Sequence, residues 1–315
     1  MTDPADGTSS LSLARSLAPA LVAGCDGRLG EIRWFRTDWQ RGGAGTGFAA
    51  WHDADGATIE VVVKFPVPGR ELRWFRRLGD GDAPPVARLF ASGDELGGRD
   101  LAWIVIERLP FGPLSSRWSD AQLDRLADAA ARFQARAAAF PVDREPEREE
   151  WPVRLAAARK QVHDPTFPLR SRWVAALKEA ERRLDAVLRR WDARGPLAWL
   201  HGDLHPANAM SRAGLEEGPA TLIDLGEVRP GHWVEDGVYL ERLLWTKPSP
   251  RSPLRSIADA RKRHGLENGE WAPLAACRRF LLAATAPAFP GERSPAFLAA
   301  NLDRLEASFR DVPKG

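Results

Sequence analysis

The sequence has few cysteines and no long apolar run, and each shortage excludes a class of protein. Only two of its 315 residues are cysteine, Cys25 and Cys277, and they lie far apart in no metal-ligand spacing. We therefore expect reduced thiols, as in cytoplasmic proteins, and neither a disulfide framework nor a cysteine metal site. No run of eighteen or more apolar residues occurs, so we expect no membrane-spanning helix.

An excess of charge of one sign is also missing. The formal net charge is +2, whereas a nucleic-acid binder would need a strong basic excess. The first residues lack the basic stretch of a signal peptide, and the apolar piece behind them is interrupted by Arg15. We therefore expect a soluble, cytoplasmic protein with neither a nucleic-acid nor a membrane partner.

The first 109 residues carry mostly strand patterns. Residues 58–65 are rich in β-branched side chains, and an Asp55-Gly56 pair before them is a hairpin signal. We predict a small β-rich lobe over 1–109, with an antiparallel sheet and two helices. The expected strands are 31–39, 58–65, 86–93 and 101–109, and the expected helices are 10–23 and 70–79.

Residues 110–315 carry mostly helical patterns. Ser119, followed three residues later by Gln122, is a capping-box signature that begins a helix. Apolar residues at steps of three and four between 171 and 191 predict an amphipathic helix. Further helices are expected at 253–265, 271–286 and 295–310, and a polar linker at 143–150. The prediction is an α+β chain whose second, larger lobe is mainly helical.

The segment "WLHGDLHPANAM", residues 199–210, is too rich in polar side chains to serve packing alone. Polar residues at 211–219 separate two short apolar pieces, 207–210 and 220–223, and predict a β-hairpin that brings Asn208 close to Asp224. An amide and a carboxylate presented together suit Mg2+, which takes oxygen ligands. From five residues before Asn208, Asp203 is placed to accept a hydroxyl proton. This arrangement is typical of phosphoryl transfer.

The two histidines of this segment allow a different interpretation. His201 and His205 have an H-x3-H spacing, which suits zinc when it lies on a helix face. Gly202 and Pro206 disfavour a helix here, and no third ligand is close in the sequence. We interpret His201 as support for the loop and His205 as a residue that shapes the approach to the site.

The run H-G-D-x-x-x-x-N followed by I-D-x-G resembles the catalytic loop and metal-binding motif of the aminoglycoside phosphotransferase/choline kinase family. The resemblance implies a bilobal, protein-kinase-like fold, with a catalytic loop at 199–210 and a metal-binding segment at 221–236. It implies that Asp203 is the catalytic base, that Asn208 and Asp224 bind Mg2+, and that Asp236 braces the loop.

The resemblance extends in order over about residues 30–245 and implies an ATP site in the β-rich lobe. Lys64, in "VVVK", matches the lysine that contacts phosphates, and it is one of only six lysines in the chain. Glu71 matches the glutamate that pairs with it. The connector that meets adenine matches Glu107 to Leu109, with Ile106 guarding the pocket behind it. The glycine-rich loop matches Gly43, Gly45 and Gly47 within residues 41–47.

The predicted function is therefore an ATP- and Mg2+-dependent transfer of phosphate to a hydroxyl of a small molecule. An aminoglycoside, an amino sugar, a sugar and an amino alcohol all stay open as acceptors. The short Asp224–Asp236 segment speaks against a protein kinase. A non-catalytic, nucleotide-binding regulatory protein on the same fold is the alternative. Residues expected near the acceptor are Glu227, Arg229, His232 and Trp233.

Overall fold

The computed structural model describes residues 5–35, 45–247, 251–289 and 294–314. The chain divides into two compact units, unit 1 with residues 1–137 and 206–228, and unit 2 with residues 138–205 and 229–315. Unit 1 thus takes in two segments beyond residue 109, where we place the end of the β-rich lobe; that boundary stays a prediction. Among the described residues, no helix has the length and apolar character needed to cross a bilayer.

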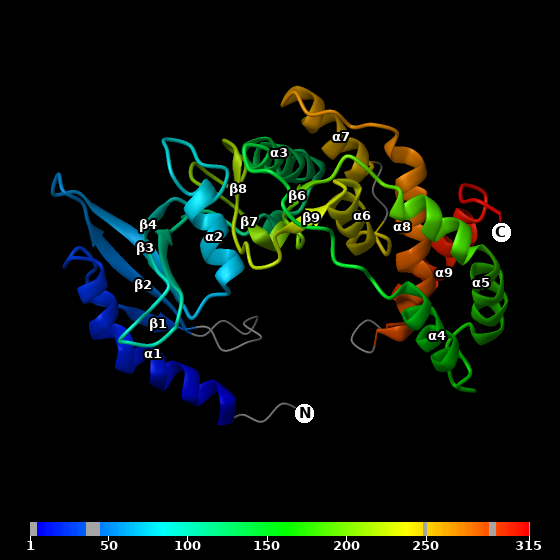
Figure 1. Cartoon of the computed structure of the whole chain (residues 1–315), viewed down its shortest axis with the longest axis horizontal. Coiled ribbons are helices and arrows are strands. Elements are labelled where there is room, and N and C mark those ends of the chain that lie inside the picture. Colours follow the sequence, from blue (N-terminus) through cyan, green and yellow to red (C-terminus); the bar gives the residue numbers. More distant parts are fainter. Residues whose placement is uncertain (1–4, 36–44, 248–250, 290–293, 315) are drawn as a thin grey trace. The chain divides into compact units, whose positions relative to one another are not determined.

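Unit 1 is built on a five-stranded antiparallel sheet with the strand order β1-β2-β3-β5-β4 (Figure 1). A second, smaller pair of strands, β7 and β8, forms a separate hairpin. The strands of unit 1 are β1 (Arg33–Phe35), β2 (Gly45–His52), β3 (Thr58–Phe65), β4 (Leu89–Gly93), β5 (Trp103–Glu107), β7 (Ala209–Ser211) and β8 (Ala220–Leu222). Its helices are α1 (Ala5–Gly24), α2 (Gly69–Leu78), η1 (Leu114–Arg117), α3 (Asp120–Ala137) and η2 (Pro206–Asn208).

The alternation of β3 gives the two faces of this sheet different roles. Successive side chains of a strand point to opposite faces. Val61 and Val63 are buried in a cluster that includes Leu21 of α1. Lys64 belongs to the other face, where it meets Glu71 of α2. One face therefore forms the core of unit 1, and the opposite face carries the lysine that the sequence singled out; α1 and α2 lie on different sides of the sheet in Figure 1.

Most of the predicted elements of unit 1 are confirmed, and one is wrong. The Asp55-Gly56 turn joins β2 to β3, and the Ser119 hydroxyl accepts the N–H of Gln122 at 3.3 Å. Residues 45–47, expected in a loop, instead begin strand β2. A Cβ at Gly47 would lie 2.6 Å from Cγ2 of Ile32, so this glycine allows two chain segments to approach closely. The remainder of the expected loop, with Gly43, lies outside the described residues.

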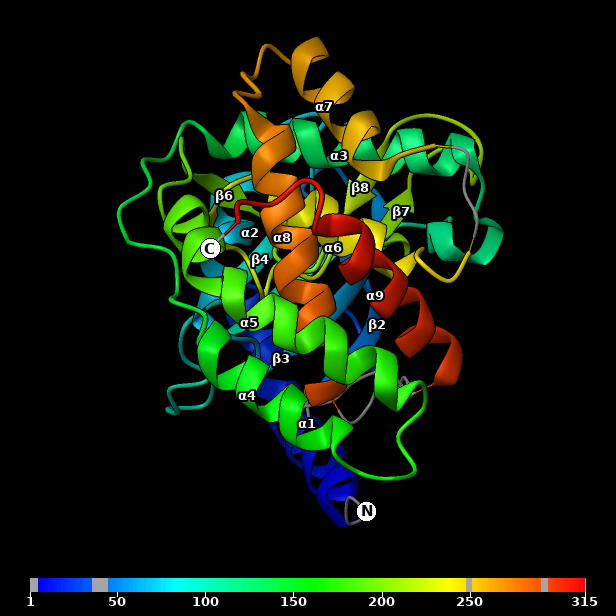
Figure 2. The same cartoon turned by 90° about the vertical axis from the view of Figure 1, so that its right-hand side faces the viewer.

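Unit 2 is mainly helical. Helix α8 contacts α4, α5, α6 and α9, and these helices enclose a core with several tryptophans (Figure 2). A short antiparallel pair joins β6, which leads into the 201–205 loop, to β9, which precedes α6. The elements of unit 2 are α4 (Trp151–Val162), α5 (Arg170–Asp192), β6 (Ala198–Leu200), β9 (Arg229–Gly231), α6 (Val234–Leu243), α7 (Pro253–Arg263), α8 (Trp271–Thr285), η3 (Ala286–Ala288) and α9 (Pro295–Ser308). The four helices predicted here are confirmed, whereas α4, α6 and the β6–β9 pair were not predicted.

We predict that Gly93→Ala destabilises unit 1. A Cβ at Gly93 would lie 2.7 Å from Cε2 of Trp103, whose ring is buried and fixed by donation from Nε1 to the carbonyl of Glu95. We expect the free energy of unfolding to fall by about 1–3 kcal/mol in urea denaturation. Gly69→Ala is the control, since no atom lies within 4 Å of a Cβ there. Equal stabilities of the two variants would contradict this packing argument.

Candidate functional site

One cluster of predicted site residues lies in unit 1, around Lys64. Strand β3 holds Lys64 beside helix α2, and its Nζ donates to Oε1 of Glu71 at 2.7 Å. The same Nζ lies 3.5 Å from Oδ1 of Asp224. Lys64, Glu71 and Asp224 are thus brought together from a strand, a helix and the segment after β8. This is a cation held between two carboxylates that come from distant parts of the sequence.

The electrostatics of this cluster keep Lys64 charged. Burial lowers the pKa of Lys64, but the carboxylates of Glu71 and Asp224 outweigh burial and raise that pKa above its ordinary value. The carboxyl group of Glu71 is buried, whereas the side chain of Asp224 is 53% exposed. Glu71 therefore fixes the lysine, and the exposed carboxylate of Asp224 stays accessible to a further ligand.

The predicted hairpin is confirmed, and it brings Asn208 close to Asp224. Ala209 pairs with Leu222, and the N–H of Ile223 donates to the carbonyl of Asn208 at 3.0 Å. Asp224 adopts a φ of 60°, a left-handed conformation that costs a non-glycine residue about 1–3 kcal/mol and is often found at functional sites.

This pair fits the ligands that Mg2+ takes from proteins. Mg2+ is bound by one or two side-chain oxygens, and water and phosphate oxygens complete its coordination. Asn208 and Asp224 supply one amide and one carboxylate oxygen of that kind. Within the described parts of the chain, no group of three or more His, Cys, Asp or Glu side chains is arranged to hold a metal. A zinc site at the two histidines therefore gains no support from the described residues.

The predicted connector is the end of β5, and an arginine fixes it. The side chains of Ile106 and Leu109 are buried. The N–H groups of Glu107 and Arg108 already donate to backbone carbonyls in the sheet, which leaves the N–H of Leu109 as the connector's candidate donor to a base. Arg212 donates to both carboxylate oxygens of Glu107, at 2.8 to 3.1 Å. This ion pair ties the connector to the β7–β8 hairpin, and the sequence had given no sign of it.

A second cluster lies in unit 2 and is organised by Asp236. Its Oδ2 accepts the N–H of His201 at 2.9 Å, and its Oδ1 accepts the N–H of Gly202 at 3.0 Å. The carboxyl group is buried, and burial raises its pKa despite these bonds and the nearby His201 and Arg229. Asp236 thus binds the backbone of the loop directly before Asp203.

Asp203 itself is held by two side chains of unit 2. The hydroxyl of Tyr239 donates to Oδ1 at 2.8 Å, and Nε2 of His205 lies 3.3 Å from Oδ2. Burial raises the pKa of Asp203, but the bonds from His205 and Tyr239, together with nearby His201, outweigh burial and lower that pKa to about 2. The side chain is 33% exposed, so Asp203 presents an ionised carboxylate to solvent.

The four residues expected near the acceptor have different environments. Glu227 is 68% exposed and lies 3.9 Å from Arg70 in unit 1. In unit 2, Arg229 donates to the buried Glu235 at 2.7 Å. His232 and Trp233 are buried, and Nε1 of Trp233 donates to the carbonyl of Asn268 at 3.1 Å. Their burial favours a supporting role over contact with an acceptor.

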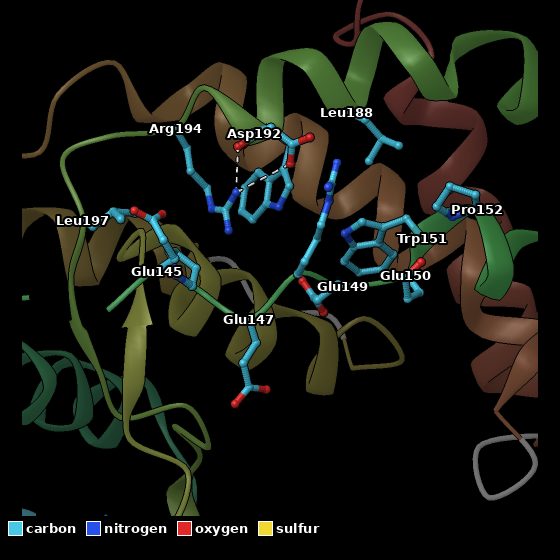
Figure 3. A pocket seen from close by; sticks show the side chains of 13 residues that line it. Glu145, Glu147, Glu149, Glu150, Trp151, Pro152, Leu188, Asp192, Arg194 and Leu197 are labelled. Atoms are coloured by element: carbon cyan, nitrogen blue, oxygen red, sulfur yellow. Dashed lines mark hydrogen bonds and ion pairs between the residues drawn. The ribbon is translucent and has the colours of Figure 1, made fainter. Parts of the chain in front are cut away.

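Unit 2 also contains a cavity of about 650 Å³ with acidic and aromatic walls (Figure 3). Arg194 lines this cavity and donates to the carbonyl of Trp191 at 2.9 Å. Leu197, which lines the cavity, precedes β6, whereas the loop with Asp203 follows β6. The cavity is therefore at the opposite end of this strand from the loop. Its main lining side chains are Glu145, Glu147, Glu149, Glu150, Trp151, Trp191, Asp192 and Arg194.

Comparison with known proteins identifies the family. A sequence model of the phosphotransferase enzyme family, APH, matches residues 38–277. The chain belongs to this phosphotransferase enzyme family. The matched range includes both clusters described above, so Lys64 and Asp203 each lie inside the family's part of the sequence. No curated protein matches the chain. The resemblance stated from the sequence is confirmed.

Solved structures of similar proteins confirm the α+β, protein-kinase-like fold of this phosphotransferase. An aminoglycoside phosphotransferase from Alicyclobacillus acidocaldarius has a TM-score of 0.57 at 14% identity, over 92% of this chain and 91% of that chain. A thermostable mutant of aminoglycoside phosphotransferase APH(4)-Ia, in ternary complex with AMP-PNP and hygromycin B, has a TM-score of 0.53 at 15% identity, over 94% and 98%. A choline/ethanolamine kinase family protein from Mesorhizobium loti has a TM-score of 0.52 at 14% identity, over 96% and 94%.

The stability of this phosphotransferase should depend on the protonation of His232. Burial, with Arg261 and Arg194 nearby, outweighs the carboxylate of Glu235 and lowers the pKa of His232 to about 4. The unfolded chain takes up this proton near pH 6.5, so acidification between pH 6.5 and about 4 favours unfolding. We therefore predict that wild type loses more stability than His232→Gln between pH 7 and pH 5 in urea denaturation.

The control for this titration is His163→Gln, because His163 is exposed. This variant should lose stability in parallel with wild type as the pH falls. A parallel loss in His232→Gln as well would show that His232 does not resist protonation in the folded protein.

Proposed function

We propose that this chain is an ATP- and Mg2+-dependent phosphotransferase that phosphorylates a hydroxyl group of a small molecule in the cytoplasm. The observation that carries the proposal is the state of Asp203, a partly exposed carboxylate with a pKa of about 2 in a chain of the phosphotransferase family. A general base must be unprotonated at working pH and accessible to a substrate, and the lowered pKa and the 33% exposure of Asp203 support this role.

In the proposed reaction, each cluster has its own task. Asp203 accepts a hydrogen bond from the acceptor hydroxyl and takes its proton as the hydroxyl oxygen forms a bond to the γ-phosphorus. The bond between that phosphorus and the β,γ-bridging oxygen breaks, and ADP leaves. Lys64, held by Glu71, binds the α- and β-phosphates. Mg2+, when bound by Asn208 and Asp224, supplies positive charge to the phosphate oxygens.

The adenine of the nucleotide is proposed to form hydrogen bonds with the connector from Glu107 to Leu109, with Ile106 lining the pocket behind it. Gly45, the first residue of β2, is proposed to lie near the phosphates, whereas Gly47 pairs with β1 and β3 on both sides and has its N–H in the sheet. The AMP-PNP in the APH(4)-Ia complex supports ATP as the donor.

For the acceptor, the proposal keeps aminoglycosides, amino sugars, sugars and amino alcohols. A carboxylate base at Asp203 can take the proton of any acceptor hydroxyl, so it does not distinguish among these four classes of molecule. The hygromycin B in the APH(4)-Ia complex supports the aminoglycoside class. Among the residues first expected near the acceptor, Glu227 is the most exposed and Arg229 is partly exposed, and we keep both as candidates for contact. His232 and Trp233 are proposed to support the site from inside unit 2.

Asp203→Asn is predicted to lower kcat by about 10²–10⁴-fold while the affinity for ATP stays close to that of wild type. An amide cannot take the hydroxyl proton, whereas the nucleotide is proposed to bind to residues of unit 1. The measurement is coupled ADP release over a panel of choline, homoserine, hexosamines and aminoglycosides, with nucleotide affinity from calorimetry. Asp303→Asn, an exposed acid on α9, is the control and should retain full activity. Undiminished turnover in Asp203→Asn would show that the base is assigned wrongly.

Asp224→Asn is predicted to raise the Mg2+ concentration for half-maximal activity about tenfold or more, because a neutral amide binds Mg2+ more weakly than a carboxylate does. A Mg2+ titration at saturating ATP measures this change. Asp94→Asn, an exposed acid in unit 1, provides the matched control. An unchanged Mg2+ requirement would remove Asp224 from the metal site.

The alternative function, a non-catalytic nucleotide-binding protein, predicts a different set of results. ATP with Mg2+ would then raise the melting temperature of the protein, yet no acceptor in the panel would be phosphorylated. The intact set of Lys64, Asp203, Asn208 and Asp224 favours the enzyme, since a non-catalytic protein has no need to keep a base.

A further inference from the structure

Tyr239 is the only tyrosine in the chain, and its hydroxyl donates a hydrogen bond to Asp203, the proposed base. It lies on α6, three residues after Asp236. Residues three apart on a helix share a face. The two side chains therefore reach the same loop from one helix, Asp236 to the backbone of His201 and Gly202 and Tyr239 to the carboxylate of Asp203.

Helix α6 is fixed firmly enough to set the position of that hydroxyl. At its first turn, the buried Glu235 accepts from Arg229 at 2.7 Å and from Arg194 at 3.3 Å. At Gly237, Leu254 of α7 lies where a Cβ would be, so the two helices pack closely there. Unit 2 thus holds α6 by charge at its first turn and by packing at Gly237.

The two oxygens of the Asp203 carboxylate differ in their partners. Oδ1 accepts from Tyr239 at 2.8 Å, and Oδ2 lies 3.3 Å from Nε2 of His205, which belongs to the loop itself. The bond from the helix is the shorter one. The hydroxyl of Tyr239 therefore holds Oδ1 from a helix, whereas His205 contacts Oδ2 from within the loop.

We propose that Tyr239 is a positioning residue for phosphoryl transfer, which holds the carboxylate of Asp203 through Oδ1 in the orientation that meets the acceptor hydroxyl. This inference rests on the proposed function of Asp203 as the base. The ionisable groups that act on this carboxylate include His201 and His205 besides Tyr239. The bond from Tyr239 connects the carboxylate to helix α6, so its loss should affect the chemical step through Asp203.

The first test is a double-mutant cycle on kcat. Tyr239→Phe keeps the ring and removes the hydroxyl, and we expect kcat to fall about 10–100-fold, the usual worth of a hydrogen bond to a charged group. In an Asp203→Asn background, Tyr239→Phe should change the residual kcat less than about twofold, because the carboxylate on which it acts is gone. A merely structural role would lower kcat by the same factor in both backgrounds, and that result would overturn the proposal, as would unchanged kcat in the single variant.

Thr285→Val is the control for the cycle. It removes a buried hydroxyl of α8 that donates to the carbonyl of Leu281 at 2.8 Å. Its kcat should equal that of wild type, so a loss on removing the Tyr239 hydroxyl is not a general effect of deleting buried hydroxyls from unit 2.

The second test needs no turnover and separates this inference from the proposed function. Labelling with 3-fluorotyrosine gives one fluorine resonance, since the chain has a single tyrosine. We expect Asp203→Asn to move this resonance and Asp303→Asn to leave it in place. If wild type phosphorylates no acceptor but the resonance moves, the proposed function fails and the Tyr239–Asp203 contact stands. An unmoved resonance in Asp203→Asn would overturn the inference even in an active enzyme.

Discussion

The buried carboxylate of Asp236 is the contact on which the second cluster depends. A buried charge is costly unless it is fully bonded, and burial raises the pKa of this group. Its two oxygens are matched to two consecutive backbone donors, those of His201 and Gly202. Because the next residue is Asp203, the anchor fixes the chain directly before the proposed base. Without it, the buried N–H of His201 and the partly buried N–H of Gly202 would lose their acceptor.

Asp236 therefore attaches the 201–205 loop to helix α6. Phosphoryl transfer gains most of its rate from positioning and from charge, so the base must be held before the acceptor arrives. Asp236 holds the backbone of the loop, and Tyr239 holds the carboxylate of Asp203. Glu235 fixes the first turn of the helix through Arg229. The first turn of α6 contains two acidic residues, Glu235 and Asp236, and both are buried in the structure.

Features that depend on local sequence patterns were predicted, whereas features that depend on contacts between distant residues were not. The β7–β8 hairpin follows from turn residues between two apolar pieces, and the placement of Asn208 near Asp224 follows from the hairpin. The strand that begins at Gly45 was missed because its glycines read as a loop, whereas close packing against Ile32 requires one of them. The Tyr239–Asp203 bond spans 36 residues, and no periodicity reports a partner so distant. The one available sign was a lone tyrosine one helical turn after Asp236.

Each of the two clusters has supporting partners from its own unit. The partners that fix Lys64, namely Glu71 and Asp224, come from unit 1, and those that fix Asp203 come from unit 2. In the proposed function, Lys64 and Asp203 are each held by bonds that need no ligand. A nucleotide and an acceptor would then contact groups that are already in place, which reduces the ordering cost of reaching the transition state. The division also explains why Asp203 and Asn208, five residues apart in one motif, are supported by different elements: the first by α6 and the second by the hairpin.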